Sequence, residues 1–401
     1  MRGVEMVLTA VVLCGLGVLL GYTEADLVLA GGGLADDNAD VYGTIVDLAG
    51  GPGVANIGII TTASADPLDS ATFYQDLFIN TYGAASATWI AVTETSGNAD
   101  TQEIYDLVMA QSGLFFGGGD QARIMTAWRR PNGSASLGMS AIIALEAGGG
   151  VVAGSSAGAA CQGNGPMLEG GLSYQALRYG AYAGGYNPDY PDDLCYDELG
   201  GLGLLPGYIV DTHFSERGRE GRLIKLLLDT EFSGRGLGVD ENSAVHIDSN
   251  GTAKVLGTAG GVLVVDVSSV EMLDGDYSRF NNATVSYYSE GDVFSTKNDE
   301  YMMAEWKSDL TGNEYSQYAP TSSNIFSSPD ANHREYGVFR LMATLLWDSK
   351  ELSSVHDTYE KNPSFVVTLN KGDGVAYGGY STSTAVWTIS YHRMTVDVNY
   401  L

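Results

Sequence analysis

Short apolar segments alternate with longer amphipathic stretches from residue 26 to about residue 160. Of all the features of the sequence, this alternation limits the possible folds most strongly. The apolar segments have the length of buried strands, and the amphipathic stretches have the length of surface helices. Strands separated by such helices pair in parallel and are covered on both faces. We therefore predict an α/β fold with a mostly parallel sheet. The predicted strands are residues 26–30, 56–62, 87–92, 113–116 and 150–154, and the predicted helices are residues 68–82, 99–111 and 140–147.

The pattern changes after about residue 236, where strand-like segments follow one another without helices between them. Such segments, separated by short Gly-containing turns, predict antiparallel strands. Residues 290–335 are polar and only weakly periodic. The predicted elements of this part are strands at 239–247, 253–256, 262–267, 364–369, 385–391 and 394–398, and a helix at 335–348.

The N-terminus carries an apolar segment, residues 6–22, which follows Arg2. This pattern is typical of a signal peptide, and Thr23 and Ala25 supply small residues for cleavage after residue 25. We predict that residues 1–25 are a signal peptide and that the protein is secreted or periplasmic. A retained N-terminal membrane anchor is the alternative, although the segment is short for a bilayer span.

The chain is strongly acidic, with 49 acidic and 20 basic residues and a formal net charge of −29. Nucleic acid is not expected as a partner because phosphate binding needs a basic surface. A cationic substrate would be attracted to such a protein, and solubility outside the cell is the alternative explanation of the charge. The three cysteines, Cys14, Cys161 and Cys195, are too few for a disulfide framework. Whether Cys161 pairs with Cys195 stays open, and no metal site is indicated.

The sequence Gly154-Ser155-Ser156-Ala157-Gly158 follows a predicted strand and precedes a helix-compatible run. This G-x-S-x-G pattern in a strand–turn–helix context is typical of a nucleophile elbow. The glycines relieve crowding at the sharp turn, where the serine takes a strained backbone conformation. Ser156 is therefore the candidate nucleophile, and the Ala157 N–H is a candidate oxyanion donor.

A serine nucleophile needs a base and an acidic partner that orients it. Of the five histidines, His213 ends a predicted strand and so lies at the sheet edge that carries the elbow; His246, His333, His356 and His392 fit structural or surface roles better. For the carboxylate we prefer Glu241, with Asp240 next, because both end the strand 236–239. Asp211 is closer in sequence, but its carboxylate need not meet the His213 ring.

Two further clusters are candidates for substrate contacts. Arg217, Arg219 and Arg222 stand close together in a chain with few cations. Arginine binds carboxylates through two parallel hydrogen bonds, so these residues could hold the carboxylates of a substrate. Ion pairing with the neighbouring glutamates is the alternative role. The loop 117–121, with Gly118 and Gly119, offers backbone N–H groups for an oxyanion hole. It lacks the lysine of a nucleotide-phosphate loop.

These motifs together resemble cyanophycinases and their relatives among the S51 serine peptidases, which include the aspartyl dipeptidases called peptidase E. The matching stretches are FFGGGDQARI at 115–124, VVAGSSAGAA at 151–160, DTHFSERGREGRL at 211–223 and GLGVDENSA at 236–244, with VSYYSEGDVF at 285–294 resembling the end of the family core. Two positions depart from the family pattern: Thr212 replaces the usual Gln before the histidine, and Ser155 replaces the usual Thr of the elbow.

The resemblance implies a three-layer α/β/α sandwich like that of class I glutamine amidotransferases, with a catalytic domain at 26–295 and a C-terminal extension at 296–401 packed on it. It implies Ser156 as nucleophile, His213 as general base and Glu241 as acidic partner, with no cofactor, and it suggests a homodimer. The implied oxyanion donors are Gly118, Gly119 and Ala157, and the implied substrate-binding residues are Gln121, Asp211, Thr212, Arg217, Arg219 and Arg222.

The implied substrate is cyanophycin, a poly-aspartate backbone with arginine on each side chain, which the family degrades to β-aspartyl-arginine. The arginine-rich motif at 211–223 favours this substrate over the short aspartyl or isoaspartyl peptides that peptidase E cleaves. A non-catalytic binding protein on the same fold is the alternative from another class, and the intact Ser156, His213 and Glu241 speak against it.

Overall fold

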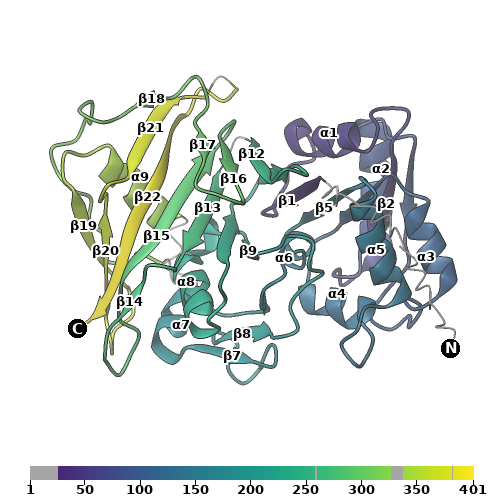
Figure 1. The fold of residues 1–401 in the computed structure, drawn as a ribbon, viewed down its shortest axis with the longest axis horizontal. Coiled ribbons are helices and arrows are strands. Elements are labelled where there is room, and N and C mark those ends of the chain that lie inside the picture. Colours follow the sequence, from purple (N-terminus) through teal and green to yellow (C-terminus); the bar gives the residue numbers. More distant parts are fainter. Residues whose placement is uncertain (1–25, 258–259, 327–336, 382) are drawn as a thin grey trace, which may run out of the picture.

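The computed structural model describes residues 26–257, 260–326, 337–381 and 383–401. Two large sheets lie next to each other, one flanked by helices at the N-terminal end and one made largely of long strands at the C-terminal end (Figure 1). The predicted signal peptide, Cys14 and His333 lie outside the described residues. In the described part of the chain, no helix is both long and apolar enough to span a bilayer.

The first sheet has nine strands in the order β17-β16-β12-β11-β1-β5-β4-β2-β3. The strands from β1 to β3 in this order are parallel, and the other four are antiparallel. The parallel strands are β1 (Leu27–Ala30), β2 (Asn56–Ile60), β3 (Ser86–Trp89), β4 (Gly113–Phe116) and β5 (Val151–Ser155). The antiparallel strands are β11 (Ser243–Ile247), β12 (Thr252–Gly257), β16 (Val293–Ser295) and β17 (Tyr301–Met302). The predicted α/β fold is confirmed, and the five parallel strands form one side of this sheet.

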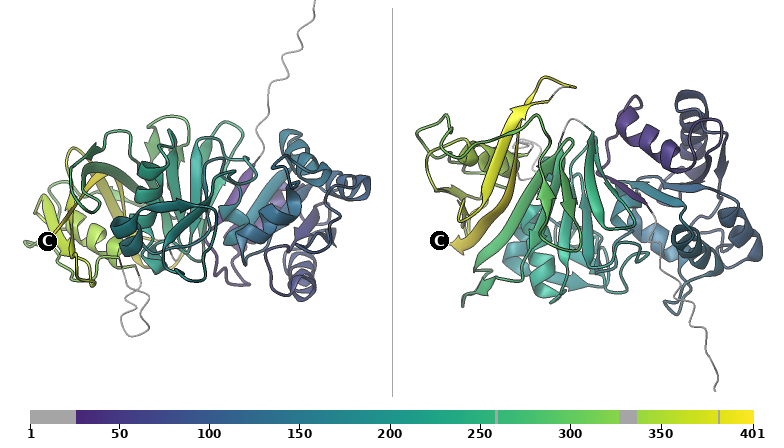
Figure 2. Two further views of the ribbon diagram at one scale, coloured as in Figure 1. Left: turned by 90° about the horizontal axis from the view of Figure 1, so that it is seen from below. Right: turned by 45° about the horizontal axis from the view of Figure 1, so that its top comes forward.

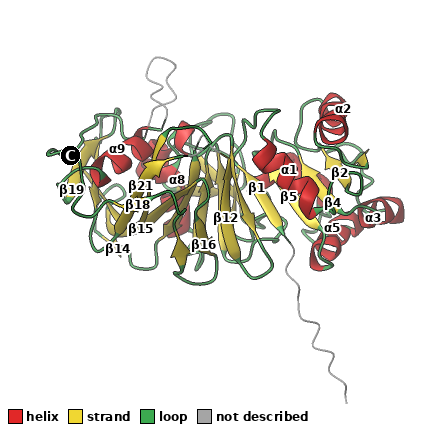
Figure 3. Ribbon diagram, turned by 90° about the horizontal axis from the view of Figure 1, so that it is seen from above, coloured by secondary structure: helices red, strands yellow, loops and turns green. Residues whose placement is uncertain are grey.

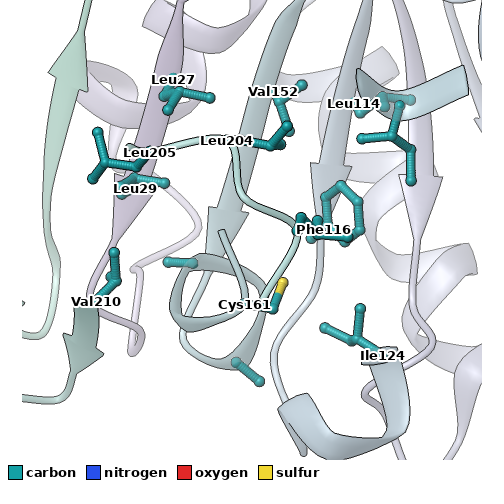
Figure 4. Close-up of a cluster of buried hydrophobic side chains, with 14 of the residues drawn as sticks. Leu27, Leu29, Leu114, Phe116, Ile124, Val152, Cys161, Leu204, Leu205 and Val210 are labelled. Atoms are coloured by element: carbon teal, nitrogen blue, oxygen red, sulfur yellow. The ribbon is translucent and has the colours of Figure 1, made fainter. Parts of the chain in front are cut away.

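Helices cover both faces of the parallel strands (Figure 3). Val28 and Ala30 of β1 pack in the core with α1 and α2, whereas Leu27 and Leu29 pack in the core with α3, α4 and α5. Figure 4 shows part of this second core, which includes Phe116. Because side chains alternate along a strand, a strand that is apolar throughout must be covered on both sides. The helices are α1 (Ala39–Leu48), α2 (Pro67–Asp76), α3 (Gln102–Met109), α4 (Gln121–Trp128) and α5 (Leu137–Ala147), and α2 continues into a π-helical turn (Leu77–Thr81).

Each of these five helices begins at a polar side chain that accepts a hydrogen bond from a backbone N–H of the first turn. Such caps satisfy donors that have no partner within the helix, and each stabilises the helix by about 1 kcal/mol. The capping residues are Asn38, Asp66, Thr101, Asp120 and Ser136. The helix starts are therefore encoded locally in the sequence.

The second sheet contains ten strands, and its main path runs β18-β21-β22-β15-β13-β10-β9. Among the described residues of this sheet, only β9 and β10 pair in parallel. The strands on the path are β9 (Tyr208–Thr212), β10 (Arg235–Val239), β13 (Gly261–Asp266), β15 (Phe280–Ser289), β22 (Trp387–Tyr400), β21 (Val375–Tyr380) and β18 (Ser308–Asp309). Strands β14 (Glu271–Met272), β19 (Ser353–Asp357) and β20 (Phe365–Asn370) join at its side. Helices α7 (Ser173–Tyr179), α8 (Glu220–Asp229) and α9 (Val338–Trp347) pack with this sheet.

Strands β18 to β22, from the C-terminal part of the chain, complete the second sheet. Strand β22 pairs along β15, and Figure 2 shows these two strands side by side. The sequence predicted two strands at 385–391 and 394–398, but the structure forms one strand. Arg393 lies at the interruption with a φ of 66°, and the pairing with β15 shifts register nearby. The strand therefore continues through a local irregularity that breaks the apolar alternation.

Candidate active site

Ser156 lies at a sharp turn between β5 and the short helix α6 (Ala157–Ala160). Its φ of 55° and ψ of −120° are strained for a residue with a side chain. The turn needs glycine on both sides: a Cβ on Gly154 would lie 2.1 Å from the Gly158 carbonyl oxygen, and one on Gly158 would lie 2.2 Å from the Phe116 carbonyl oxygen. The local sequence thus builds the elbow and presents the serine hydroxyl at the carboxyl end of the sheet.

Three side chains form a continuous hydrogen-bonded line. The Ser156 Oγ is 2.8 Å from His213 Nε2, and His213 Nδ1 is 2.6 Å from Glu241 Oε1. This is the arrangement of a Ser-His-carboxylate triad, in which the acid orients the imidazole and the imidazole accepts the serine proton.

His213 and Glu241 come from the second sheet, at the ends of β9 and β10, whereas Ser156 comes from the first. The two sheets are joined at this point because the His213 N–H donates to the Gly31 carbonyl at 2.8 Å. A Cβ on Gly32 would lie 2.4 Å from His213 Cε1, so only glycine allows the imidazole to approach β1 this closely. The triad therefore spans the junction between the two sheets.

The electrostatic surroundings of His213 favour its neutral form. Burial lowers the pKa of His213 below its usual value, and the nearby positive charge of Arg217 lowers the pKa further. The hydrogen bond to Glu241 opposes this shift without reversing it. A neutral imidazole can accept a proton, which a general base must do.

The backbone beside the triad carboxylate is held by a second acidic residue. The Glu241 N–H donates to Glu216 Oε2 at 3.0 Å. Burial raises the pKa of Glu216 to about 7, and the charge of Asp240 contributes to this shift.

Asp240 faces away from the imidazole, although it was the second candidate for the triad acid. Its buried carboxylate accepts hydrogen bonds from the Ser215 N–H at 2.9 Å, the Gly261 N–H at 3.1 Å, the Tyr287 hydroxyl at 2.9 Å and Arg340 at 2.7 Å. Of the three carboxylates considered from the sequence, Glu241 is thus the one in contact with His213.

The predicted oxyanion donors lie next to the nucleophile. A Cβ on Gly118 would lie 3.2 Å from Ser156 Cβ and 3.7 Å from its Oγ, so the loop after β4 passes directly beside the serine. Ala157 follows the serine at the start of α6. Among the described residues, the N–H groups of Gly118 and Ala157 have no hydrogen-bond acceptor, as an oxyanion hole requires. Gly119 has a φ of 139° and lies in the exposed part of the same loop.

Asp211, Arg219 and Arg222 form a buried ion network beneath the triad. Arg222 donates to both oxygens of Asp211, at 2.8 and 2.6 Å, and to the Gly171 carbonyl at 2.7 Å. Arg219 donates to Asp211 at 3.3 Å and to the Thr212 carbonyl at 2.5 Å. The Asp211 side chain is 2 % exposed and the Arg222 side chain is 5 % exposed. This buried network therefore supports the end of β9, which is directly followed by His213.

The other predicted substrate-binding residues occupy different positions. Thr212 is buried in β9. Gln121 starts α4 and donates to the Leu168 carbonyl at 2.5 Å. Arg217 is exposed beside His213. Contact of any of these residues with substrate stays a prediction.

The remaining histidines and cysteines have other surroundings. His246 contacts Asp26 at 2.8 Å, His356 contacts Ser354 at 2.7 Å, and His392 contacts Tyr288 at 2.8 Å. Cys161 and Cys195 are free and buried. Burial raises the pKa of both thiols, that of Cys195 to about 11.

Sequence reasoning missed the residues that support the triad loop: Glu216, Tyr287 and Arg340. Glu216 lies within the motif at 211–223, but the sequence indicates only that it could pair with the neighbouring arginines. For Tyr287 and Arg340 there was no local signal, because they reach Asp240 from positions 47 and 100 residues away.

The chain is similar to known peptidases in sequence and in structure. Residues 27–255 match the family described as peptidase family S51. A crystal structure of a peptidase from an acI-B1 Actinobacterium is similar with a TM-score of 0.49 and 17% identity, covering 69% of this chain and 98% of the other. A putative peptidase E protein from Listeria monocytogenes EGD-e is similar with a TM-score of 0.37 and 13% identity, covering 59% of this chain and 99% of the other. The family match spans more than half of the chain, and the protein therefore belongs to peptidase family S51, the serine peptidases to which its motifs had pointed.

Proposed function

We propose that this serine peptidase hydrolyses cyanophycin to β-aspartyl-arginine, with Ser156, His213 and Glu241 as its catalytic triad. The hydrogen-bonded line from Ser156 Oγ through His213 to Glu241 is the observation that carries the catalytic assignment. The motif at 211–223, which resembles that of cyanophycinases, and the net charge of −29, which suits an arginine-rich polymer, support the substrate.

In the first half of the reaction, Ser156 Oγ attacks an aspartyl backbone carbonyl while its proton passes to His213 Nε2. Glu241 stabilises the resulting imidazolium, and the N–H groups of Gly118 and Ala157 stabilise the oxyanion. The C–N bond then breaks, the amine leaves with the proton from His213, and an acyl-enzyme remains. Base catalysis typically contributes about 10²–10⁴-fold, and one oxyanion donor typically contributes about 10²–10³-fold.

In the second half, water attacks the acyl-enzyme carbonyl and gives its proton to His213. The bond from the carbonyl carbon to Ser156 Oγ breaks, and the serine takes back the proton. The product carboxylate leaves, and the enzyme returns to its starting state without a cofactor.

The test is mass spectrometry of the soluble products after the full chain is incubated with insoluble cyanophycin. We expect release of β-aspartyl-arginine, and loss of that release in the Ser156→Ala variant. If Ser156→Ala keeps substantial activity, Ser156 is not the nucleophile. If the folded protein releases nothing from cyanophycin but cleaves isoaspartyl dipeptides, its substrate is the short peptides of the peptidase E type.

We also propose that residues 1–25 are removed as a signal peptide, so that the mature protein is exported. N-terminal sequencing of the protein recovered from its native host should begin at Asp26. A mature chain that still carries residues 6–22 would instead support a membrane anchor.

A further inference from the structure

A cavity lined by aromatic rings is formed by residues between Tyr179 and Cys195, none of which takes part in the mechanism. Its volume is about 810 Å³. Four tyrosines line it with rings that are 48–63 % exposed: Tyr179, Tyr182, Tyr186 and Tyr190. Exposed aromatic rings gathered around one cavity are uncommon on a soluble surface and indicate a binding site.

Two hydrogen bonds in succession link the wall of this cavity to the segment that follows the oxyanion loop. Gln121, which follows that loop, donates to the Leu168 carbonyl at 2.5 Å. Leu168 ends strand β6 (Met167–Leu168), and the next N–H, that of Glu169, donates to the Cys195 carbonyl at 3.0 Å. Cys195 lies on β8 (Leu194–Asp197) and lines the cavity. In Figure 1, β7 (Ala181–Ala183) and β8 lie below α6, with α4 to their right.

The cavity is also acidic. Asp193 is part of its wall, and the Glu169 carboxylate lies 2.6 Å from where a Cβ on Gly185, another wall residue, would stand. Burial raises the pKa of both carboxyl groups, with Asp197 adding to the shift at Glu169 and Asp192 at Asp193. A bound cation would relieve this repulsion, whereas an anion would increase it.

Aromatic faces together with carboxylates are the surroundings that a guanidinium group prefers. The flat cation stacks on the negative face of a ring and donates hydrogen bonds to carboxylates. The protein already contains one such contact here, because the Arg178 guanidinium lies 4.9 Å above the Tyr179 ring centre. Close to His213, the exposed Arg217 offers a positive charge for the substrate carboxylate.

We propose that this tyrosine cavity is the subsite that binds the arginine side chain of the peptide substrate, with Tyr186 and Asp193 as its main contacts. The inference rests on the proposed peptidase function and adds the place on the protein where the arginine side chain binds. The substrate carboxylate would face Arg217, and its guanidinium would face the cavity.

The test compares binding of an oligomer of three β-aspartyl-arginine units with the same oligomer carrying citrulline, a neutral isostere of arginine. Calorimetry on the full-length Ser156→Ala protein measures affinity without turnover. We expect the arginine oligomer to bind at least about tenfold more tightly, as a desolvated cation–π contact with a carboxylate partner allows. Adding Tyr186→Leu and Asp193→Asn should reduce this preference to about twofold or less.

Tyr315→Leu is the matched control, because Tyr315 is 89 % exposed and outside the cavity; it should leave the preference unchanged. Three outcomes would each overturn the subsite. Both oligomers could bind with equal affinity, the preference could survive the cavity substitutions, or the arginine oligomer could fail to bind at millimolar concentration. Failure of the proposed function looks different: the protein with its serine intact would release no product, while the arginine preference of Ser156→Ala would persist.

Discussion

The Arg340 guanidinium donates a hydrogen bond of 2.7 Å to the carboxylate of Asp240, the residue directly before Glu241 of the triad. Arg340 belongs to α9, in the C-terminal segment beyond the family match, whereas Asp240 has a fully buried side chain between the two sheets. Arg340 also lies 3.6 Å from Glu216, which holds the Glu241 N–H. The C-terminal segment thus supplies the cation that balances two acids around the triad loop.

Arg340→Ala should therefore weaken both the fold and catalysis. Leaving Asp240 buried without its cation should lower the free energy of unfolding by about 3 kcal/mol, as when one partner of a buried pair is removed. The value of kcat should fall because the Glu241 loop loses its support. Urea denaturation and steady-state kinetics measure the two effects. Arg340→Lys keeps the charge and should recover part of both, and an Arg340→Ala protein with unchanged stability would contradict the role of this ion pair.

Arg217→Ala should move the acid limb of the kcat/KM profile to higher pH. The positive charge of Arg217 lowers the pKa of His213, so removing it makes the imidazole easier to protonate, and the base is lost at a less acidic pH. A pH series on a soluble peptide substrate measures the position of the limb separately from the height of the plateau. Arg217→Lys is the control and should leave the limb in place; a limb that does not move in the alanine variant would count against this coupling.

Asp211→Asn should destabilise the protein at neutral pH by about 3 kcal/mol, because Arg222 would be left buried beside a neutral side chain. Burial alone would raise the pKa of Asp211, but Arg222 and Arg219 hold it below its usual value. The stabilisation is thus present above the unfolded pKa, about 3.9, and is lost as the pH falls through the folded value. Urea titrations should show the difference between wild type and variant shrinking below about pH 4; an equal difference at every pH would exclude this ionic origin.

Gly118→Ala should damage catalysis while leaving the fold intact. The new methyl group would lie 3.2 Å from Ser156 Cβ and crowd the space where the substrate carbonyl must approach the oxyanion donors. We expect kcat/KM to fall by about 10²-fold or more, as when an oxyanion donor is displaced. Gly43→Ala is the matched control: it lies in α1 with nothing within 4 Å of the added Cβ, so activity should stay unchanged and stability should rise by up to about 1 kcal/mol. Full activity in Gly118→Ala would place the oxyanion hole elsewhere.

Local chemistry determined the features that the sequence revealed correctly. The elbow at Ser156 depends on Gly154 and Gly158, whose hydrogen atoms are the only side chains that fit there, and such requirements are visible in a short motif. The same holds for the parallel strands, whose continuous apolar runs imply cover on both faces. The helix starts at caps such as Asp66 and Ser136 are equally local.

The less periodic C-terminal part resisted prediction for a physical reason. Strand β15, residues Phe280–Ser289, was not identified as a strand, although it is one of the longest in the structure. Its side chains alternate irregularly because the pairing with β22 shifts register. Pairing across more than a hundred residues leaves no regular local pattern.

The sequence by itself determined the α/β class, the serine elbow and a short set of candidates for its base and acid. Only the tertiary structure decided that Glu241, and neither Asp240 nor Asp211, meets His213, because three carboxylates of similar chemistry differ only in the direction in which the folded backbone points them. It also decided that Arg340 supports the triad and that four tyrosines surround one cavity. Such contacts join residues far apart in the chain, and their proximity is set by the packing of the whole molecule.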